Sequence, residues 1–265
     1  ATPTLRSVLA GAPRTIVGPE TSVYDASLLM TEHRKAALVV DQSGCVVGVF
    51  GFKDMMKRVI AQELPVRSTA VEAVMTPNPE TVSPDLTVIE ALQIMNDNKC
   101  LTLPVCEEEG TVVGLVDVMD VIYGAGGVQG WRSWFISMMD MTDDLSDEAS
   151  ASSRDKSEFS GSRFRSTDKS VAKLRPSKPN IAETSDTILA VAQMLKMKRG
   201  SASLLTNSDG SLAGIITDTD FTRRVVAKHV DPAIVTVSEV MTPNPTCVAM
   251  SDSATDALTI MVENH

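Results

Sequence analysis

The stretch "VMTPNP" occurs twice in this chain, at residues 74–79 and 240–245, which are 166 positions apart (240 − 74). A hexamer that holds Met, Asn and two prolines is not expected to recur by chance, so it indicates a duplicated structural unit. The match extends on both sides of the hexamer. "RVIA" at 58–61 meets "RVVA" at 224–227 with the same offset. Residues of about 15–79 and 180–245 are therefore two copies of one pattern.

A shorter repeat lies inside the longer one. Each copy reads as a start signal, an apolar helix, a short strand, a turn, a second strand and a second helix. Because each proline disfavours a helical residue before it, the hexamer must follow the end of a helix. We predict that it joins consecutive β-α-β-β-α units. The order is found at 21–61, 85–124 and 185–227, and its beginning is found again at 251–265.

Composition excludes several classes of function. The formal charge of −10 argues against non-specific nucleic-acid binding, which depends on neutralising phosphates. No apolar run reaches the 18 or so residues of a membrane span, and we expect a cytoplasmic location. The four cysteines form no C-x-x-C pair and the three histidines are scattered, so no metal site is predicted. We find no nucleophile elbow, P-loop or Ser-His-Asp set, and therefore expect no catalytic residues and no enzyme.

The combined motifs resemble those of the CBS domain, named after cystathionine β-synthase. The pattern contains the hexamer, a helix, "LPV" at 103–105 and "GIITDTD" at 214–220, and it covers nearly all of the chain outside roughly 125–170. Within that family, the chain looks most like eukaryotic proteins with four CBS repeats and a Phox-Bem type interaction domain. The resemblance implies an α+β fold in which β-α-β-β-α repeats pack as pseudo-twofold pairs.

The domain boundaries follow from this resemblance. Residues 1–124 are expected to form the first pair, with repeats at about 5–62 and 70–124, and residues 125–171 a partly disordered linker. Residues 172–265 are expected to form a second pair whose last repeat is truncated. We interpret the chain as cut from a longer one, which would leave apolar surface of the third repeat uncovered. CBS modules also resemble dimer-forming discs, which implies a homodimer.

The resemblance further implies that adenosine nucleotides (AMP, ADP or ATP) or S-adenosylmethionine bind as regulatory ligands, through the pattern G-h-h-[ST]-x-x-D. A carboxylate can accept hydrogen bonds from both ribose hydroxyls, and a Thr hydroxyl at a helix start can donate one. The third repeat has the full pattern, with Ile215, Ile216, Thr217 and Asp220. Arg223 and Arg224 follow one turn later and are candidate phosphate contacts.

The other two repeats depart from the pattern. The first repeat keeps Asp54 and adds Lys53, but it has Gly51 where a hydroxyl is expected. The second keeps Asp120, preceded by Asp117, a carboxylate that would repel a phosphate. Adenine is expected beside the early strands, which makes two further residues candidates. These are Val82 and Ile181.

Each of these residues has a structural alternative. Thr217 and Asp220 could simply cap a helix, and the arginines could lie on a solvated helix face. Three functions remain open. The chain could be a non-enzymatic sensor of adenosine nucleotides in clefts between repeats, a function in energy sensing that acts through protein–protein interaction. It could be a structural or oligomerisation scaffold with empty clefts, or the regulatory part of a larger enzyme or transporter.

Overall fold

The computed structural model describes residues 2–124 and 169–263. These residues form two compact units, which we describe separately. Among the described residues, one unit contains 2–121 and 178–246, and the other contains 122–124, 169–177 and 247–263. The first unit holds three of the predicted repeats. The predicted linker at 125–171 lies outside the described residues, except at 169–171.

Repeat one is built on a four-stranded sheet in the order β1-β2-β3-β4. β1 pairs in parallel with β2, and the other two pairings are antiparallel. Ser22 caps the first helix, because its side chain accepts a hydrogen bond from the backbone N–H of Asp25. The elements are β1 (Ile16–Val17), α2 (Val23–His33), β2 (Ala37–Val40), β3 (Val46–Phe50), α3 (Phe52–Asp54), η1 (Met55–Val59), η2 (Ile60–Gln62), η3 (Val71–Ala73) and β4 (Thr76–Pro77).

Repeat two has a two-stranded antiparallel sheet, extended by a parallel bridge between Val82 and Val105. Thr87 and Glu90, three residues apart, form a capping box at the start of the first helix of this repeat. The N-terminal helix α1 (Leu5–Leu9) packs on this repeat, where the side chain of Leu9 lies over Gly114. The other elements are α4 (Val88–Asp97), β5 (Thr102–Cys106), β6 (Val112–Asp117) and α5 (Val118–Gly124).

Repeat three reproduces the sheet of repeat one in the order β10-β9-β8-β7. Its elements are β7 (Ile181–Glu183), α7 (Ile188–Met197), β8 (Ala202–Thr206), β9 (Leu212–Thr217), α8 (Asp218–Asp220), η5 (Phe221–Val225), η6 (Val226–Lys228), η7 (Val237–Glu239) and β10 (Thr242–Pro243). The second unit contains η4 (Val171–Leu174) and α9 (Ala254–Glu263), which contact each other.

The hexamer is more than the predicted connector, because its Thr-Pro pair forms an edge strand in each copy. Thr76 and Pro77 are β4, and Thr242 and Pro243 are β10. Proline is tolerated there because an edge strand leaves one row of N–H positions unpaired. In each copy, the methionine before the Thr-Pro pair lies over a glycine of the neighbouring strand in the sheet. A Cβ atom built on Gly214 would lie 2.5 Å from Sδ of Met241 and 2.8 Å from the carbonyl oxygen of Thr242.

An arginine links each hexamer to the second helical segment of its repeat, which is η1 in repeat one and η5 in repeat three. In repeat three, Nη1 of Arg224 donates to the carbonyl oxygen of Val240, at 2.9 Å. In repeat one, Nη1 of Arg58 donates to the carbonyl oxygen of Val74 at 3.1 Å and also bonds that of Met75. The two arginines are 166 positions apart (224 − 58), as are the two hexamers. This contact explains why the helix motif and the hexamer recur together.

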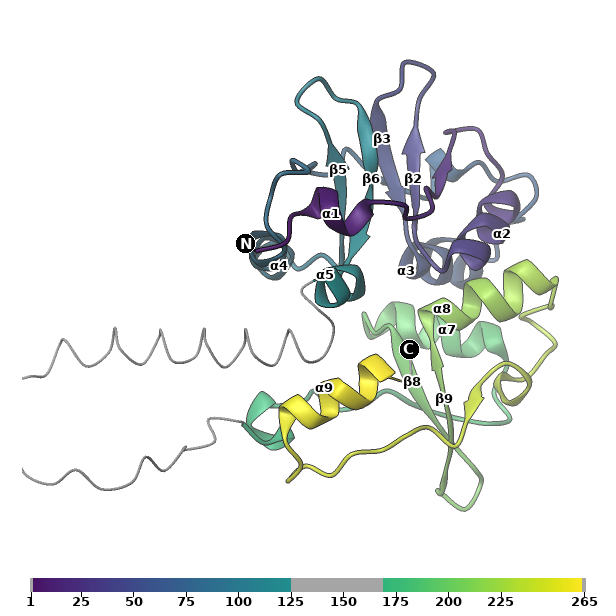
Figure 1. Cartoon of the computed structure of the whole chain (residues 1–265). Coiled ribbons are helices and arrows are strands. Elements are labelled where there is room, and N and C mark those ends of the chain that lie inside the picture. The colour runs from purple at the N-terminus through teal and green to yellow at the C-terminus, as the bar shows by residue number, and fades with distance from the viewer. Residues whose placement is uncertain (1, 125–168, 264–265) are drawn as a thin grey trace, which may run out of the picture. The chain divides into compact units, whose positions relative to one another are not determined.

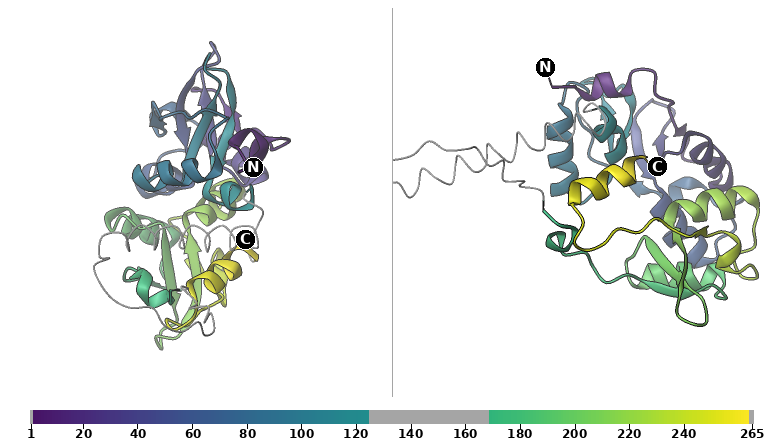
Figure 2. Two further views of the ribbon diagram at one scale, coloured as in Figure 1. Left: turned by 60° about the vertical axis from the view of Figure 1, so that its left-hand side comes forward. Right: turned by 60° about the horizontal axis from the view of Figure 1, so that its bottom comes forward.

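Repeat one has two different neighbours within the first unit (Figure 1). Its sheet faces repeat two across a small apolar cluster that includes Leu38, Val49 and Leu115. Its helices face repeat three, where α2 packs against η5 and η6, and α7 packs against η1 and η2. One hydrophobic core runs through that helical contact and includes Phe50 and Phe221, both with no exposed surface. Figure 2 shows the same unit from two other sides.

The predicted fold class is confirmed, since the structure is a mixed α+β fold of repeated β-α-β-β-α units. The sequence did not predict that repeats one and three share a core. The two copies of the hexamer lie in these two repeats, and their helices form symmetric contacts. The 166-residue period therefore marks two halves of one helical interface.

We predict that Gly214→Ala lowers the free energy of unfolding by about 1–3 kcal/mol, because the new methyl group overpacks against a backbone carbonyl that cannot move aside. Gly18→Ala is the matched control. A Cβ atom at Gly18 meets only Oγ1 of Thr21, at 3.7 Å, so this variant should stay within about 0.5 kcal/mol of the parent chain. Urea titrations measure both changes. Equal stabilities of the two variants would contradict the packing argument.

Candidate functional site

The start of α8 brings together the two residues of repeat three that the sequence singled out. Oδ2 of Asp220 accepts hydrogen bonds from the backbone N–H of Thr217, at 2.8 Å, and from its hydroxyl, at 2.9 Å. The structure therefore shows the helix cap that was the alternative interpretation. A carboxylate has about four lone-pair sites. The third contact of Asp220 is to Nε of Arg224, at 3.3 Å, so one acceptor position remains for a ligand.

Strand alternation divides the apolar candidates between two faces. Ile181 on β7 and Ile215 on β9 lie on the face of the sheet away from the helices, together with Thr217. Ile181 is 55% exposed, so this open face has room for a ligand. The side chain of Ile216 has no exposed surface and belongs to the helix-facing core. Successive residues of a strand point to opposite faces, so Ile216 is removed from the candidate contacts.

The two arginines after Asp220 have different surroundings. Arg224 binds Asp220 and the carbonyl oxygen of Val240, a structural role that sequence reasoning missed. We therefore do not retain Arg224 as a phosphate contact. Nε of Arg223 is buried and has no hydrogen-bond partner among the described residues. A buried unpaired donor on a cationic group is costly, so Arg223 remains a candidate for an anion.

Repeat one replaces its missing hydroxyl with one from the hexamer. Oδ2 of Asp54 accepts from the backbone N–H of Gly51, at 3.0 Å, which is the same cap as in repeat three. Oδ1 of Asp54 accepts from Oγ1 of Thr76, at 3.4 Å, and lies 3.5 Å from Nε of Arg58. Burial raises the pKa of Asp54, and the Gly51 and Arg58 contacts oppose that shift. Thr76 was not identified from the sequence because it lies 22 residues away.

In repeat two, the acidic pair of Asp117 and Asp120 is neutralised by a lysine of repeat one. Asp117 and Asp120 cap each other, with N-to-O distances of 2.9 and 2.8 Å. Nζ of Lys35 forms ion pairs with both carboxylates, and its side chain is only 14% exposed. Val82, the candidate on the early strand, is buried and 8% exposed. Sequence reasoning missed Lys35, which lies 85 residues before Asp120.

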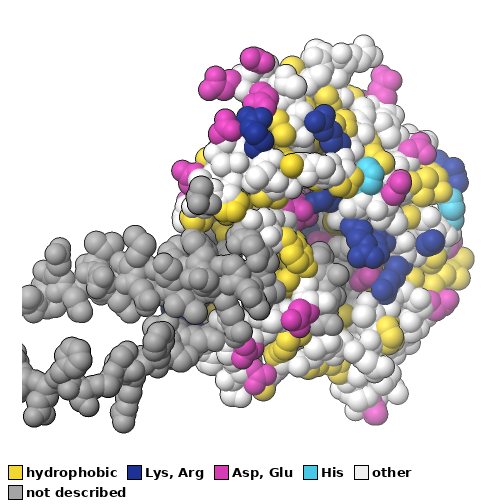
Figure 3. Space-filling model, viewed as in Figure 1, with side chains coloured by type: hydrophobic (Ala, Val, Ile, Leu, Met, Phe, Trp, Pro, Cys, Tyr) yellow, Lys and Arg dark blue, Asp and Glu magenta, His cyan; other side chains and the backbone are white. Residues whose placement is uncertain are grey.

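A group of cations gathers where repeat one meets repeat three, beside the start of α8. Burial raises the pKa of Asp218, and nearby Lys53 and Lys57 pull it back toward its ordinary value. Burial and the charge of Lys53 lower the pKa of Lys57, which also lies near Arg199. Figure 3 shows Lys and Arg side chains gathered on this face, over α3 and α8. We call Lys53, Lys57, Arg199 and Asp218 the interface cluster.

Two further findings concern the described residues alone. No three His, Cys, Asp or Glu side chains among them are placed to hold a metal ion. No helix in the described ranges is long and apolar enough to cross a membrane.

Comparison with known proteins adds a family match. The family model described as "CBS domain" matches residues 12–61, 71–125, 171–227 and 237–265. The chain is 31% identical over 256 residues to the Arabidopsis thaliana "CBS domain-containing protein CBSCBSPB3", an alignment that covers 91% of this chain and 44% of that protein. It is 40% identical over 109 residues to CBSCBSPB5 of the same plant, covering 41% of this chain and 20% of that protein. The chain thus spans less than half the length of these relatives.

A solved structure has a similar fold. A crystal structure of protein MJ1225 from Methanocaldococcus jannaschii matches with a TM-score of 0.69, covering 98% of this chain and 90% of that one. The sequence identity is 16%, so the likeness concerns the fold alone.

We predict that Lys35→Met lowers the free energy of unfolding by about 1–2 kcal/mol, because it leaves two partly buried carboxylates without their cation. Adding Asp120→Asn should recover part of the loss, and a double-mutant cycle measures that coupling. Lys198→Met, at an exposed lysine, is the control and should change stability little. Additive single effects would show that Lys35 and Asp120 are not coupled.

The raised pKa of Asp218 predicts how stability depends on pH. The folded protein holds this proton more tightly than the unfolded chain, whose Asp pKa is about 3.9. The contribution of this group is therefore fully present below about pH 3.9 and is lost as pH rises through the folded-state value. We expect Asp218→Asn to be more stable than the parent at pH 7, with the difference shrinking toward pH 4. Denaturant titrations at several pH values measure this, and a difference independent of pH would contradict it.

Proposed function

This chain belongs to the CBS-domain family, and from that premise we propose that it is a non-enzymatic regulatory module that senses an adenosine nucleotide at repeat three. The ligand would lie on the open face of the repeat-three sheet, beside the start of α8, with its phosphates toward repeat one. The interface cluster is the observation that carries this proposal. Lys53 and Lys57 of repeat one lie near Asp218 of repeat three, which falls between Thr217 and Asp220 in the chain, and α3 and α8 contact each other.

Each part of the nucleotide has a candidate partner. The remaining acceptor position of Asp220 would receive a ribose hydroxyl, and the Thr217 hydroxyl could turn from its cap toward the sugar. Adenine would pack against the exposed apolar surface of Ile181 and Ile215. Lys53 and Lys57 would receive the phosphates.

The cations favour phosphorylated ligands over S-adenosylmethionine. AMP, ADP and ATP carry negative charge that the cations would attract, whereas the sulfonium of S-adenosylmethionine is positive. Asp218 opposes this attraction when it is ionised. The unpaired Nε of Arg223 is a further donor that an anion could satisfy. The net charge of the interface cluster would thus determine how many phosphates the preferred ligand carries.

Repeats one and two offer poorer sites for the same ligand. Asp120 and Asp117 are already paired with Lys35, so a nucleotide would have to displace an ammonium group. Asp54 is engaged by Gly51, Thr76 and Arg58. We therefore propose one principal site in this chain, at repeat three.

Regulation would follow from where the site lies. Repeat three supplies the sugar and adenine contacts, while repeat one supplies Lys53 and Lys57. A nucleotide would therefore bind more tightly when these repeats are packed together, and by linkage it would stabilise that packing. A partner that recognises the packed form would then respond to nucleotide concentration. We further propose that the chain binds such a partner and that it forms a homodimer.

A second candidate function is a structural scaffold without ligand. It is favoured by the Lys35 ion pairs and by the mutual cap of Thr217 and Asp220, which satisfy the predicted ligand-binding groups internally. The extensive core shared by repeats one and three would then hold two repeats together permanently.

A thermal-shift titration with AMP, ADP, ATP and S-adenosylmethionine separates the two functions. A ligand that binds only the folded state should add about 2.7 kcal/mol at 100 times its dissociation constant. We expect stabilisation by the phosphorylated ligands, lost in Asp220→Ala. In Lys53→Ala we expect ATP binding to weaken about three- to tenfold, with a smaller effect on adenosine.

Asp209→Ala is the matched control, because it removes a carboxylate of the same repeat that caps a turn through Ser211. Its ligand response should equal that of the parent chain. If none of the four ligands stabilises the folded protein, the scaffold becomes the better account.

A further inference from the structure

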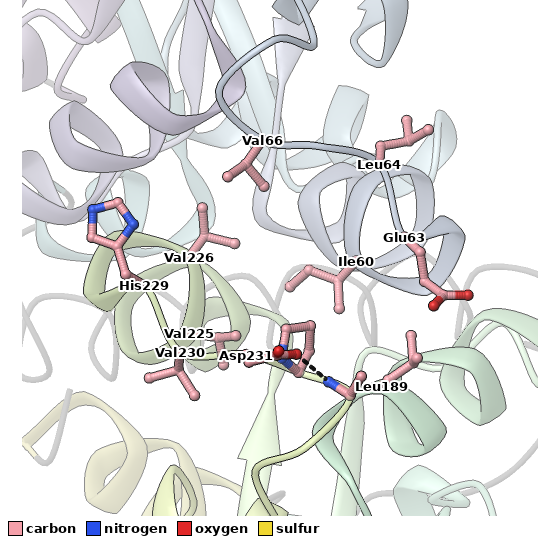
Figure 4. A pocket seen from close by; sticks show the side chains of 12 residues that line it. Ile60, Glu63, Leu64, Val66, Leu189, Val225, Val226, His229, Val230 and Asp231 are labelled. Carbon is pink, nitrogen blue, oxygen red and sulfur yellow. Dashed lines mark hydrogen bonds between the residues drawn. The ribbon is translucent and has the colours of Figure 1, made fainter.

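A hollow lies at the contact between repeats one and three, on the side where η2 and η6 end. Its volume is about 350 Å³, which is at the lower end of the range for small-molecule pockets. Ile60 and Leu64 from repeat one and Val226 and Val230 from repeat three supply apolar walls. Figure 4 shows His229 and Glu63 at opposite ends, with Ile60 and Val226 between them.

The walls are related by the internal pseudo-twofold symmetry of the chain. Ile60 corresponds to Val226 (226 − 60 = 166), and Leu64 corresponds to Val230 (230 − 64 = 166). The backbone supports the same correspondence. The N–H of Tyr24 donates to the carbonyl oxygen of Val66 at 2.9 Å, and the N–H of Leu189 donates to that of Pro232 at 2.8 Å. The hollow therefore lies across the pseudo-twofold axis.

Three planar groups stack on one another at the His229 end of the hollow. The ring of Tyr24 stacks on His229, with centroids 4.4 Å apart and an interplanar angle of 29°. The guanidinium carbon of Arg67 lies 4.3 Å from the centroid of Tyr24, and Nη2 of Arg67 is 2.9 Å from Nε2 of His229. An aromatic ring and a cation thus fill this side of the axis, an arrangement stabilised by stacking and cation–π attraction.

The symmetric positions at the other end have smaller or oppositely charged residues. Leu189 corresponds to Tyr24 (189 − 24 = 165), and Ala233 corresponds to Arg67 (233 − 67 = 166). Glu63 stands where the other repeat has His229 (229 − 63 = 166). The volume of a ring and a guanidinium group is therefore missing at this end, and a carboxylate faces the gap.

The charge of the lining selects a class of ligand. The lining residues include the carboxylates of Glu63 and Asp231 and no Lys or Arg, and the guanidinium of Arg67 lies at the His229 end, against Tyr24. Such a surface repels phosphates, so it does not suit the nucleotide proposed for the open face of repeat three. It suits a compact apolar group that carries a positive charge.

We propose that this hollow binds a small aromatic cation, an aryl amine or amidine, whose ring packs between the two repeats and whose charge pairs with Glu63. The ligand would take the place that Tyr24 and Arg67 occupy on the other side of the axis. Because its walls come from both repeats, such a ligand would strengthen their contact. The proposal is independent of the proposed nucleotide site.

Benzamidine is a suitable probe, and benzamide is its uncharged counterpart of nearly the same shape. Titration of the chain, with NMR detection of Ile, Leu and Val methyl groups, reports binding at Ile60, Leu64 and Val226. We expect benzamidine to shift these methyl signals, with a dissociation constant of about 1 mM or lower. Benzamide should bind about fivefold or more weakly, as expected for the loss of one partly exposed ion pair.

Two variants separate the charge from the volume. Glu63→Gln should reduce the preference for benzamidine over benzamide, because only the Asp231 carboxylate then remains in the lining, whereas Glu72→Gln, at an exposed residue outside the lining, should leave it unchanged. Ala233→Leu should weaken both probes, because its side chain occupies the gap; Ala233 is exposed, so the fold should tolerate the change. Absence of methyl shifts, equal affinity for the two probes, or unchanged binding in Ala233→Leu would each overturn the proposal.

Discussion

The helical contact between repeats one and three is the constraint on which the first unit depends. It carries the largest apolar cluster of the described residues, from Val23 and Phe50 in one repeat to Leu195 and Phe221 in the other. Burial of this apolar surface, at roughly 25 cal/mol per Å², is the main source of stability available to such small repeats. The hollow lined by Ile60 and Val226 lies at this contact, and α3 and α8 also meet there. Lys53 and Lys57 can approach Asp218 only because the two helical layers are packed together.

Much of the fold could be predicted from the periodicity of apolar residues and from the turn and proline signals between them. The alternation of apolar helices with short strands gave correct elements, because the signals for each element are local. The edge-strand role of the hexamer was not predicted. Proline argues against a strand when the sequence is considered alone, and the partner strand that accepts it lies about 28 residues earlier. Pairing between distant residues leaves no mark on local sequence patterns.

The candidate site was predicted less completely than the fold. The sequence identified Thr217 and Asp220, which the structure brings into contact. It did not identify Lys35 or Thr76, because each acts on a carboxylate far away in the chain. It also placed Ile216 beside the ligand, although strand alternation directs that side chain into the core.

The pseudo-twofold axis has a consequence for how such a protein can change over time. In a dimer of identical chains, every residue near the axis is present twice, so a substitution alters both sides together. Here the two halves belong to one chain, and each position can vary separately. That freedom allows Tyr24 and Arg67 to close one side while Leu189 and Ala233 leave the other open. Duplication within a chain thereby permits a broken symmetry that assembly of identical subunits forbids.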